Sequence, residues 1–160
     1  YKGAVAIGAV DFTYRGHNWI IRGQADYGHL GDAAHLSDVY NRTNSKSPFH
    51  HSSSMRTVSS NAYAFGLEAG YDIFSQIAST RKENEKLYVF GRYEQYNPYA
   101  SKMGANNYGY TEVKRMAVGL NYYPVKQIAV KAEGGIRLLA EQYNNEPYVA
   151  VGITWAGFFK

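Results

Sequence analysis

The feature that most constrains the fold is a sustained alternation, in which every second residue is apolar or aromatic and the residues between are polar or small. A period of two is typical of β-strands with two different faces, whereas helical periodicity is almost nowhere visible. In residues 19–29, for example, Trp19, Ile21 and Tyr27 alternate with Arg22 and Asp26. The alternation predicts seven strands, at about residues 3–14, 19–29, 61–74, 86–96, 112–123, 128–140 and 148–159.

The length of these segments indicates a membrane. Strands of soluble proteins typically have about 5 or 6 residues, whereas a tilted strand that crosses a bilayer needs about 9 to 11. The face between the apolar residues is also rich in Gly and Ala, and poor in the Lys, Glu and Thr of a solvated soluble sheet. We therefore expect an all-β fold, an antiparallel transmembrane β-barrel, with residues 1–160 as one segment of it. The first strand is the least regular, because it is apolar on both faces up to Asp11.

The connections between the expected strands alternate in length. Residues 15–18 and 124–127 make short links, and residues 30–60 and 97–111 make long ones. Outer-membrane barrels have short periplasmic turns and long extracellular loops, so the last strand should run down to the periplasm. Bacterial single-chain barrels have an even number of strands with both ends periplasmic. Seven strands is odd, and further strands before Tyr1 are therefore expected.

Aromatic residues cluster at the ends of the expected lipid face. Rings of Tyr and Trp prefer the headgroup level, where they form two girdles around a barrel. The predicted periplasmic girdle consists of Tyr14, Trp19, Tyr71, Tyr122, Trp155 and Phe159, and the opposite girdle consists of Tyr27, Tyr63 and Tyr93. A general preference of aromatic residues for strands does not predict this clustering at strand ends.

Composition argues against several other classes. No segment approaches the roughly 18 to 20 consecutive apolar residues of a membrane-spanning helix. The net charge of +4 comes from scattered residues of both signs, so nucleic acid is not an expected partner. The chain has no cysteine, which excludes a disulfide scaffold and a thiolate metal site.

We expect no enzyme. A barrel hydrolase needs a Ser and a His on adjacent strands, and His29, the only His within an expected strand, faces no Ser. His35, His50 and His51 fall in the connection 30–60, which we expect to be a solvated loop, and no metal or other cofactor is expected. A soluble barrel that binds a small ligand is the less favoured alternative.

The ionisable residues of the other face are the candidate functional residues, because charges inside a pore bias which ions pass. The predicted pore-lining residues are Arg22, Asp26, Glu68, Asp72, Arg92, Glu94, Arg115, Lys131, Glu133 and Arg137. Arg92, Arg115 and Arg137 lie on successive strands and could form a basic patch that favours anions. Alternatively, they pair across strands with the glutamates of the same set and stiffen the wall.

Three stretches resemble a known family. Residues 87–99, LYVFGRYEQYNPY, and residues 114–133, KRMAVGLNYYPVKQIAVKAE, resemble parts of porins in the phosphate-selective porin (O/P) superfamily. Residues 143–160, YNNEPYVAVGITWAGFFK, are similar to the last strand of that family, although Lys160 follows the aromatic Phe159. The resemblance implies a wide barrel of many strands, often trimeric, in a Gram-negative outer membrane.

The expected function is passive diffusion of small hydrophilic solutes through an outer-membrane porin. The resemblance suggests anions as solutes, whereas the lumen-facing set balances five basic against five acidic residues. The alternative is a structural or accessory barrel subunit of a larger outer-membrane complex. Expected partners are outer-membrane lipid, lipopolysaccharide and small solutes, together with further copies of the chain in a trimer or other outer-membrane proteins.

Overall fold

The computed structural model describes residues 3–45, 58–77, 85–100, 111–139 and 143–156. Among these residues the chain forms seven strands, one α-helix and one 3-10 helix. The strands are β1 (Val5–Gly16), β2 (Trp19–Leu30), β3 (Asn61–Asp72), β4 (Lys86–Asn97), β5 (Val113–Val125), β6 (Ile128–Leu138) and β7 (Glu146–Trp155). Helix α1 (Ala33–Ser45) follows β2, and the 3-10 helix η1 (Ile73–Gln76) follows β3.

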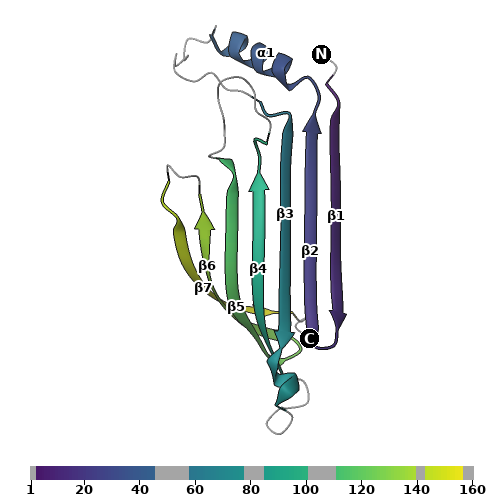
Figure 1. Cartoon of the computed structure of the whole chain (residues 1–160), viewed down its shortest axis with the longest axis vertical. Helices are drawn as coiled ribbons and strands as arrows, with labels where there is room; N and C mark the ends of the chain where they lie inside the picture. Colours follow the sequence, from purple (N-terminus) through teal and green to yellow (C-terminus); the bar gives the residue numbers. More distant parts are fainter. Residues whose placement is uncertain (1–2, 46–57, 78–84, 101–110, 140–142, 157–160) are drawn as a thin grey trace.

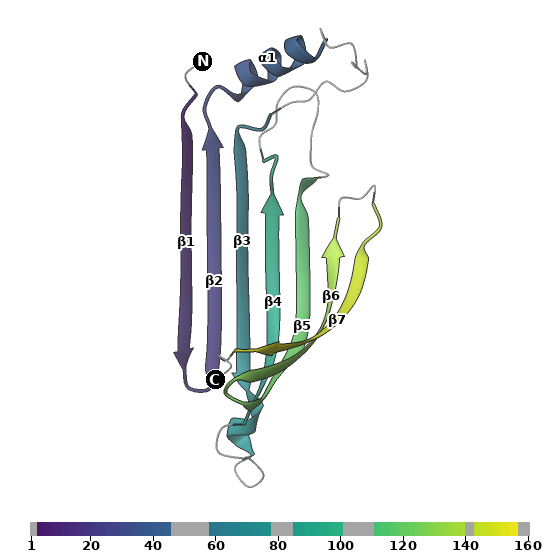
Figure 2. The same cartoon turned by 180° about the vertical axis from the view of Figure 1, so that it is seen from behind.

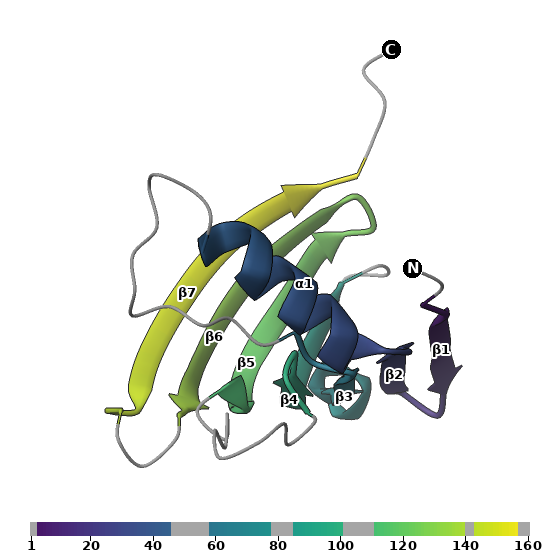
Figure 3. The same ribbon diagram turned by 90° about the horizontal axis from the view of Figure 1, so that it is seen from above.

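All seven strands form one antiparallel sheet, in which each strand pairs with its neighbours in the sequence. β1 and β7 are the two edges, so among the described residues the sheet is not closed into a barrel. Figures 1 and 2 show β1 to β4 running side by side, with β5 to β7 bending away from them. Viewed from the end that carries α1, the sheet is an open trough (Figure 3). The all-β class, the antiparallel pairing and the seven strands are confirmed.

Two tight connections set the register at the end of the trough opposite α1. The β1–β2 hairpin turns through His17 and Asn18, whose φ angles of 49° and 68° are both positive. Positive φ at both central residues is the signature of the type I′ turn, whose twist matches that of paired strands. Between β5 and β6 the register shifts between Tyr122 and Val125. Pro124 lies in this shift, where its missing N–H leaves no ladder bond unmade.

The register confirms which residues share a face. One row of cross-strand partners consists of Tyr14, Ile21, Ala69, Gly91, Val118, Gly134 and Val149. The adjacent row on the other face consists of Thr13, Arg22, Glu68, Arg92, Ala117, Gly135 and Tyr148. The sheet therefore has one apolar and one polar face, as the alternation predicted. On β1, Phe12 and Tyr14 belong to the apolar face.

The polar face is the inner side of the trough. The buried apolar residues of the strands lie on it, and they are Tyr88, Phe90, Val113, Ala117 and Ala129. Side chains on the inside of a bend are brought together, whereas those on the outside are spread apart. The apolar outer face is accordingly open, and Val149 on β7 is 83% exposed. A single sheet with its apolar side outward has the reverse of the arrangement in a soluble domain.

Two glycines permit the bend at β5 and β6. A Cβ at Gly119 would lie 2.4 Å from the carbonyl oxygen of Ala132, and a Cβ at Gly135 would lie 2.5 Å from that of Met116. No side chain fits so close to a backbone oxygen, so the local approach of the strands requires glycine at both positions. Glycine kinks of this kind introduce curvature into sheets.

Helix α1 was not predicted, because residues 30–60 were expected to be a loop. Asp32, with φ 58°, turns the chain out of β2, and its carbonyl oxygen accepts the N–H of Leu36 at 3.1 Å. Ala33 and Ser37 are buried, and the Ser37 hydroxyl accepts the N–H of Val58 at 2.8 Å. These contacts stabilise a helix whose sequence is mostly polar. Figure 3 shows α1 crossing over the mouth of the trough.

Several expected boundaries were also wrong. The third strand ends at Asp72 instead of residue 74, because the Asp72 carboxylate accepts the N–H of Phe74 at 3.2 Å and caps η1. The last strand begins at Glu146 instead of residue 148 and ends at Trp155. His35 lies in α1 instead of a loop, and His50 and His51 lie outside the described residues.

Candidate functional site

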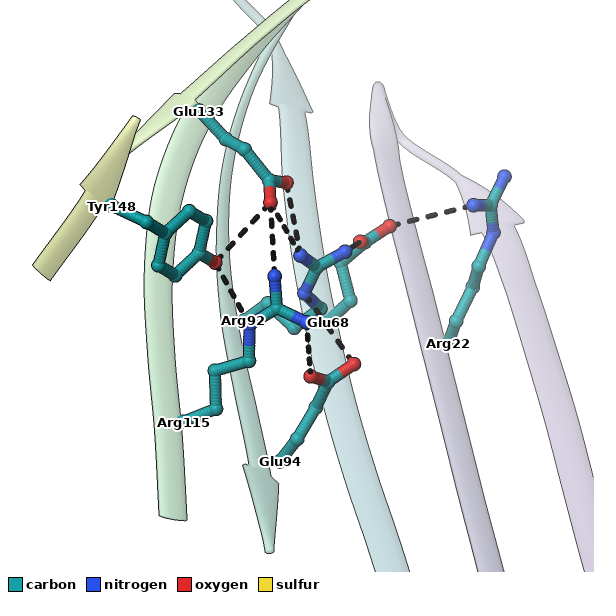
Figure 4. Close-up of polar contacts among 7 residues, drawn as sticks. All are labelled: Arg22, Glu68, Arg92, Glu94, Arg115, Glu133 and Tyr148. Atoms are coloured by element: carbon teal, nitrogen blue, oxygen red, sulfur yellow. Dashed lines mark hydrogen bonds and ion pairs between the residues drawn. The ribbon is translucent and has the colours of Figure 1, made fainter. Parts of the chain in front are cut away.

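A network of arginine, glutamate and tyrosine side chains crosses the middle of the inner face (Figure 4). Its members are Arg22, Glu68, Arg92, Glu94, Arg115, Glu133 and Tyr148, which come from β2, β3, β4, β5, β6 and β7. The alternation places these side chains on one face, and the register places them in neighbouring rows. The sequence therefore positions the network through the strands alone.

Arg92 lies at the centre of the network. Its Nη2 donates to both carboxylate oxygens of Glu133, at 3.0 and 2.9 Å. Its Nη1 lies 3.7 Å from Glu68 Oε2, and its Nε lies 3.6 Å from Glu94 Oε1. The contact with Glu133 joins β4 to β6 over the intervening strand β5, where the partner of Arg92 is the small residue Ala117. A larger side chain at Ala117, which is 4% exposed, would lie in the path of this contact.

Arg115 makes a second set of contacts around the same glutamates. Its two terminal nitrogens lie 3.6 Å from Glu94 Oε2 and 3.5 Å from Glu133 Oε1. Its Nε donates to the hydroxyl of Tyr148 at 3.0 Å, and its guanidinium carbon lies 4.6 Å from the centroid of that ring. The Tyr148 hydroxyl in turn donates to Glu133 Oε1 at 3.2 Å. Arg115 therefore links β4, β6 and β7.

The contacts decide between the two expectations for the arginines. Arg92 and Arg115 pair with glutamates on other strands, which confirms the pairing alternative for these two residues. Arg137 lies outside the network and pairs with Glu146 on β7, at 2.9 Å. Glu146 was not anticipated as a partner, because it precedes the expected start of the last strand.

The network is electrically balanced. Its three arginines, Arg22, Arg92 and Arg115, contact three glutamates within 4 Å. The formal charges of the six side chains cancel. Exposure differs along the network, since the side chain of Arg92 is 23% exposed and that of Arg22 is 50% exposed. Within the described residues, Arg22 has a single ion pair, at 3.4 Å to Glu68.

The remaining expected lumen residues share the inner face without joining the network. Gln24 donates to the Asp26 carboxylate at 2.8 Å. Asp72 is 2% exposed, and its carboxylate accepts the N–H groups of Phe74 and Leu87, so it holds the end of β3 against the start of β4. Lys131 is exposed on β6.

Most of the expected girdle residues that the structure describes lie near strand ends on the outer face, whereas Tyr93 lies opposite Leu67 in the middle of β3. Near the β1–β2 turn, the rings of Trp19 and Tyr71 lie 5.0 Å apart. Near the α1 end, the Tyr27 hydroxyl donates to Asn61 at 2.8 Å, and the Tyr63 hydroxyl donates to Glu112 at 3.0 Å.

Four other girdle residues also share the outer face. The Tyr93 hydroxyl donates to Gln95 at 2.8 Å, Tyr122 donates to Glu85, and Trp155 is the cross-strand partner of Ile128. Tyr14 contacts the turn through His17 Nδ1 at 3.0 Å. Phe159 lies outside the described residues.

The sequence reasoning missed two kinds of residue that shape the site. Tyr148 was overlooked because its neighbours on the same face, Ala150 and Gly152, are small and uncharged. Its parity with them in β7 was the signal that placed it on the inner face. The bend glycines Gly119 and Gly135 carry no such signal, because glycine is frequent throughout the chain.

The network borders a shallow hollow of about 320 Å³ between β1 and β4. Gly66 lies in its lining and supplies no side chain to fill the space between Gln24 and Glu94, its partners on β2 and β4.

No cluster of metal-binding side chains occurs among the residues that the structure describes. No helix in the described part of the chain is long and apolar enough to cross a membrane. Comparisons with protein families, curated proteins and solved structures found no match to this chain.

Proposed function

We propose that this chain forms part of the wall of an outer-membrane β-barrel pore through which small hydrophilic solutes diffuse passively. The observation that carries the proposal is the inverted polarity of the single sheet. Its outer face is apolar and exposed, with Val149, Val151 and Ile153 at 83%, 75% and 73%, and its inner face carries the charged network. An apolar face as exposed as this one has to be shielded from water, and we propose that membrane lipid contacts it on the outside of the curved sheet.

The height of the apolar face suits a bilayer. Trp19 and Tyr27 mark its two ends on β2, eight residues apart along the outer face. At roughly 3.4 Å per residue this is about 27 Å along the strand, or about 20 Å across a membrane at a tilt of 35 to 45°. The apolar band of outer-membrane barrels is about 25 Å tall. Tyr27 and Tyr63 end the band with hydroxyl groups that are hydrogen-bonded to polar side chains.

The open edges fit the same proposal. β1 and β7 each leave one row of backbone N–H and C=O groups without a strand partner among the described residues. Unpaired backbone groups cost several kcal/mol each in hydrocarbon, so a membrane sheet has to be closed into a barrel. We propose that other strands complete the barrel.

Lipid contact is tested by fluorescence quenching. Both tryptophans, Trp19 and Trp155, lie on the outer face, so brominated lipids should quench the emission of the protein folded in vesicles. The matched control replaces both tryptophans by Phe and introduces Gly152→Trp on the inner face, where the space around the Cβ position is open. The control should be quenched by aqueous iodide and not by brominated lipid. Equal lipid quenching in both proteins would contradict the proposed faces.

Conductance in planar bilayers then tests the pore itself.

A second candidate function is an accessory barrel subunit within a larger outer-membrane complex. The exposed apolar residues on the inner face of β1 favour it. There Val5 and Ile7 lie on the inner face with exposures of 67% and 80%, a surface that suits a protein partner better than water. A folded, lipid-quenched protein that carries no current would favour this second function.

A further inference from the structure

The ionisable residues of the inner face divide into paired and unpaired groups. Eight of the side chains join ion pairs, six in the network and two in the pair Arg137–Glu146. Asp72 is buried and satisfied by backbone N–H groups. Five others have no ion-pair partner within the described residues, namely Asp11, Arg15, Asp26, Lys86 and Lys131. In the part of the chain that the structure describes, these five are the charges that a solute in the trough would meet without an ion-pair partner.

The unpaired charges are sorted by sign along the trough. Asp26 lies one row above the network, on the side of α1, and Asp11 lies in the uppermost row of the network, which also contains Gln24 and Glu94. Arg15 lies beside the β1–β2 turn, and Lys86 begins β4 at the same end (Figure 1). Lys131 pairs with Asn121 on β5, nearer that end than the network. Toward α1 the unpaired charges are therefore acidic, toward the β1–β2 turn they are basic, and the neutral network lies across the level where the sign changes.

We infer that this wall gives the pore an axial electrical polarity, and that the five unpaired residues, not the network arginines, determine its ion selectivity. The inference rests on the proposed function. Asp11 and Arg15 are four residues apart on β1, or about 13 Å at roughly 3.3 Å per residue. The Debye length at 0.1 M salt is about 10 Å, so each field extends into the lumen while the two fields remain distinct.

A pore with an acidic and a basic half conducts asymmetrically. When the α1 end is electrically positive, cations enter through the acidic half and anions through the basic half, and both accumulate in the lumen. With the opposite sign both are withdrawn, and the lumen is depleted of ions. The current at 0.1 M salt should therefore be larger when the α1 side is positive. At 1 M salt the Debye length is about 3 Å, and the asymmetry should disappear.

The test compares current–voltage curves of the purified protein inserted from one side of a planar bilayer. Neutralising Asp11→Asn with Asp26→Asn, or Arg15→Gln with Lys131→Gln, should each reduce the asymmetry and shift the reversal potential in opposite directions. Exchanging the signs at all four positions should reverse the preferred direction of current, because the same side chains would then set the opposite polarity.

Lys114→Gln is the matched control, because Lys114 is exposed on β5 but lies on the outer face opposite Leu138. It removes one charge and should leave both the asymmetry and the reversal potential unchanged. A symmetric current from the original protein at 0.1 M salt, or an equal effect of Lys114→Gln, would overturn the inference while leaving the pore intact. A folded protein that carries no current at all would refute the proposed function instead.

Discussion

The contact between Arg92 and Glu133 should be a strong stabilising interaction of the sheet, because it joins two strands that are not neighbours. Both side chains are largely shielded, at 23% and 19% exposure, and two N–H···O bonds of 3.0 and 2.9 Å connect them. Removing one partner of a fully buried ion pair costs about 3 to 5 kcal/mol, whereas exposed pairs are worth about 0 to 1 kcal/mol. For this intermediate exposure we expect Arg92→Met or Glu133→Gln to lower the free energy of unfolding by about 2 kcal/mol.

A double-mutant cycle separates the contact from the rest of the network. The double variant should be less destabilised than the sum of the single variants, with a coupling energy of about 1 to 2 kcal/mol. Reversible urea unfolding from lipid vesicles, followed by the fluorescence of Trp19 and Trp155 on the outer face, measures all four proteins.

Arg22→Met is the control for this cycle. Arg22 is also an arginine of the network, but it is half exposed and has one ion pair at 3.4 Å. It should cost less than about 0.5 kcal/mol. Strictly additive single variants, or a cost for Arg22→Met equal to that of Arg92→Met, would refute the view that the contact across β5 stabilises the sheet.

Three further predictions address the faces, the bend and the orientation. Val151→Arg should destabilise the protein in lipid by about 2 to 4 kcal/mol, while Gly152→Arg on the inner face should cost under about 1 kcal/mol, and unfolding titrations that gave equal costs would show that the faces are misassigned. Gly119→Ala should destabilise by about 1 to 3 kcal/mol because its Cβ would lie 2.4 Å from a backbone oxygen, whereas Gly152→Ala, with nothing within 4 Å, should be near neutral in the same titrations. In intact cells, an impermeant thiol reagent should label Asp38→Cys in α1 and not Lys126→Cys in the opposite turn, and the reverse pattern would invert the proposed orientation.

The sequence by itself determined the strands, their faces and their neighbours. Alternation has a period of two only in a strand, so Trp19 and Ile21 had to share a face that excludes Arg22. Short turns such as the one through His17 and Asn18 reverse the direction of the chain, so the two strands that they join pair antiparallel. These properties depend on residues close together in the chain.

The tertiary structure alone decided what the charges do and where the sheet bends. Whether Arg92 faces solutes or a glutamate depends on Glu133, 41 residues away and two strands distant, and on the small residue between them. The bend at Gly119 depends on the approach of a backbone oxygen from another strand, which no local pattern encodes.

Helix α1 also depends on a contact between residues far apart in the sequence. Its polar sequence gives weak local preference, and its buried Ser37 is held by a hydrogen bond from Val58, 21 residues further along the chain. Local alternation thus fixes which way a side chain points, because the geometry of the strand is periodic. Which residues that side chain contacts depends on the curvature of the sheet and on contacts between residues far apart in the sequence.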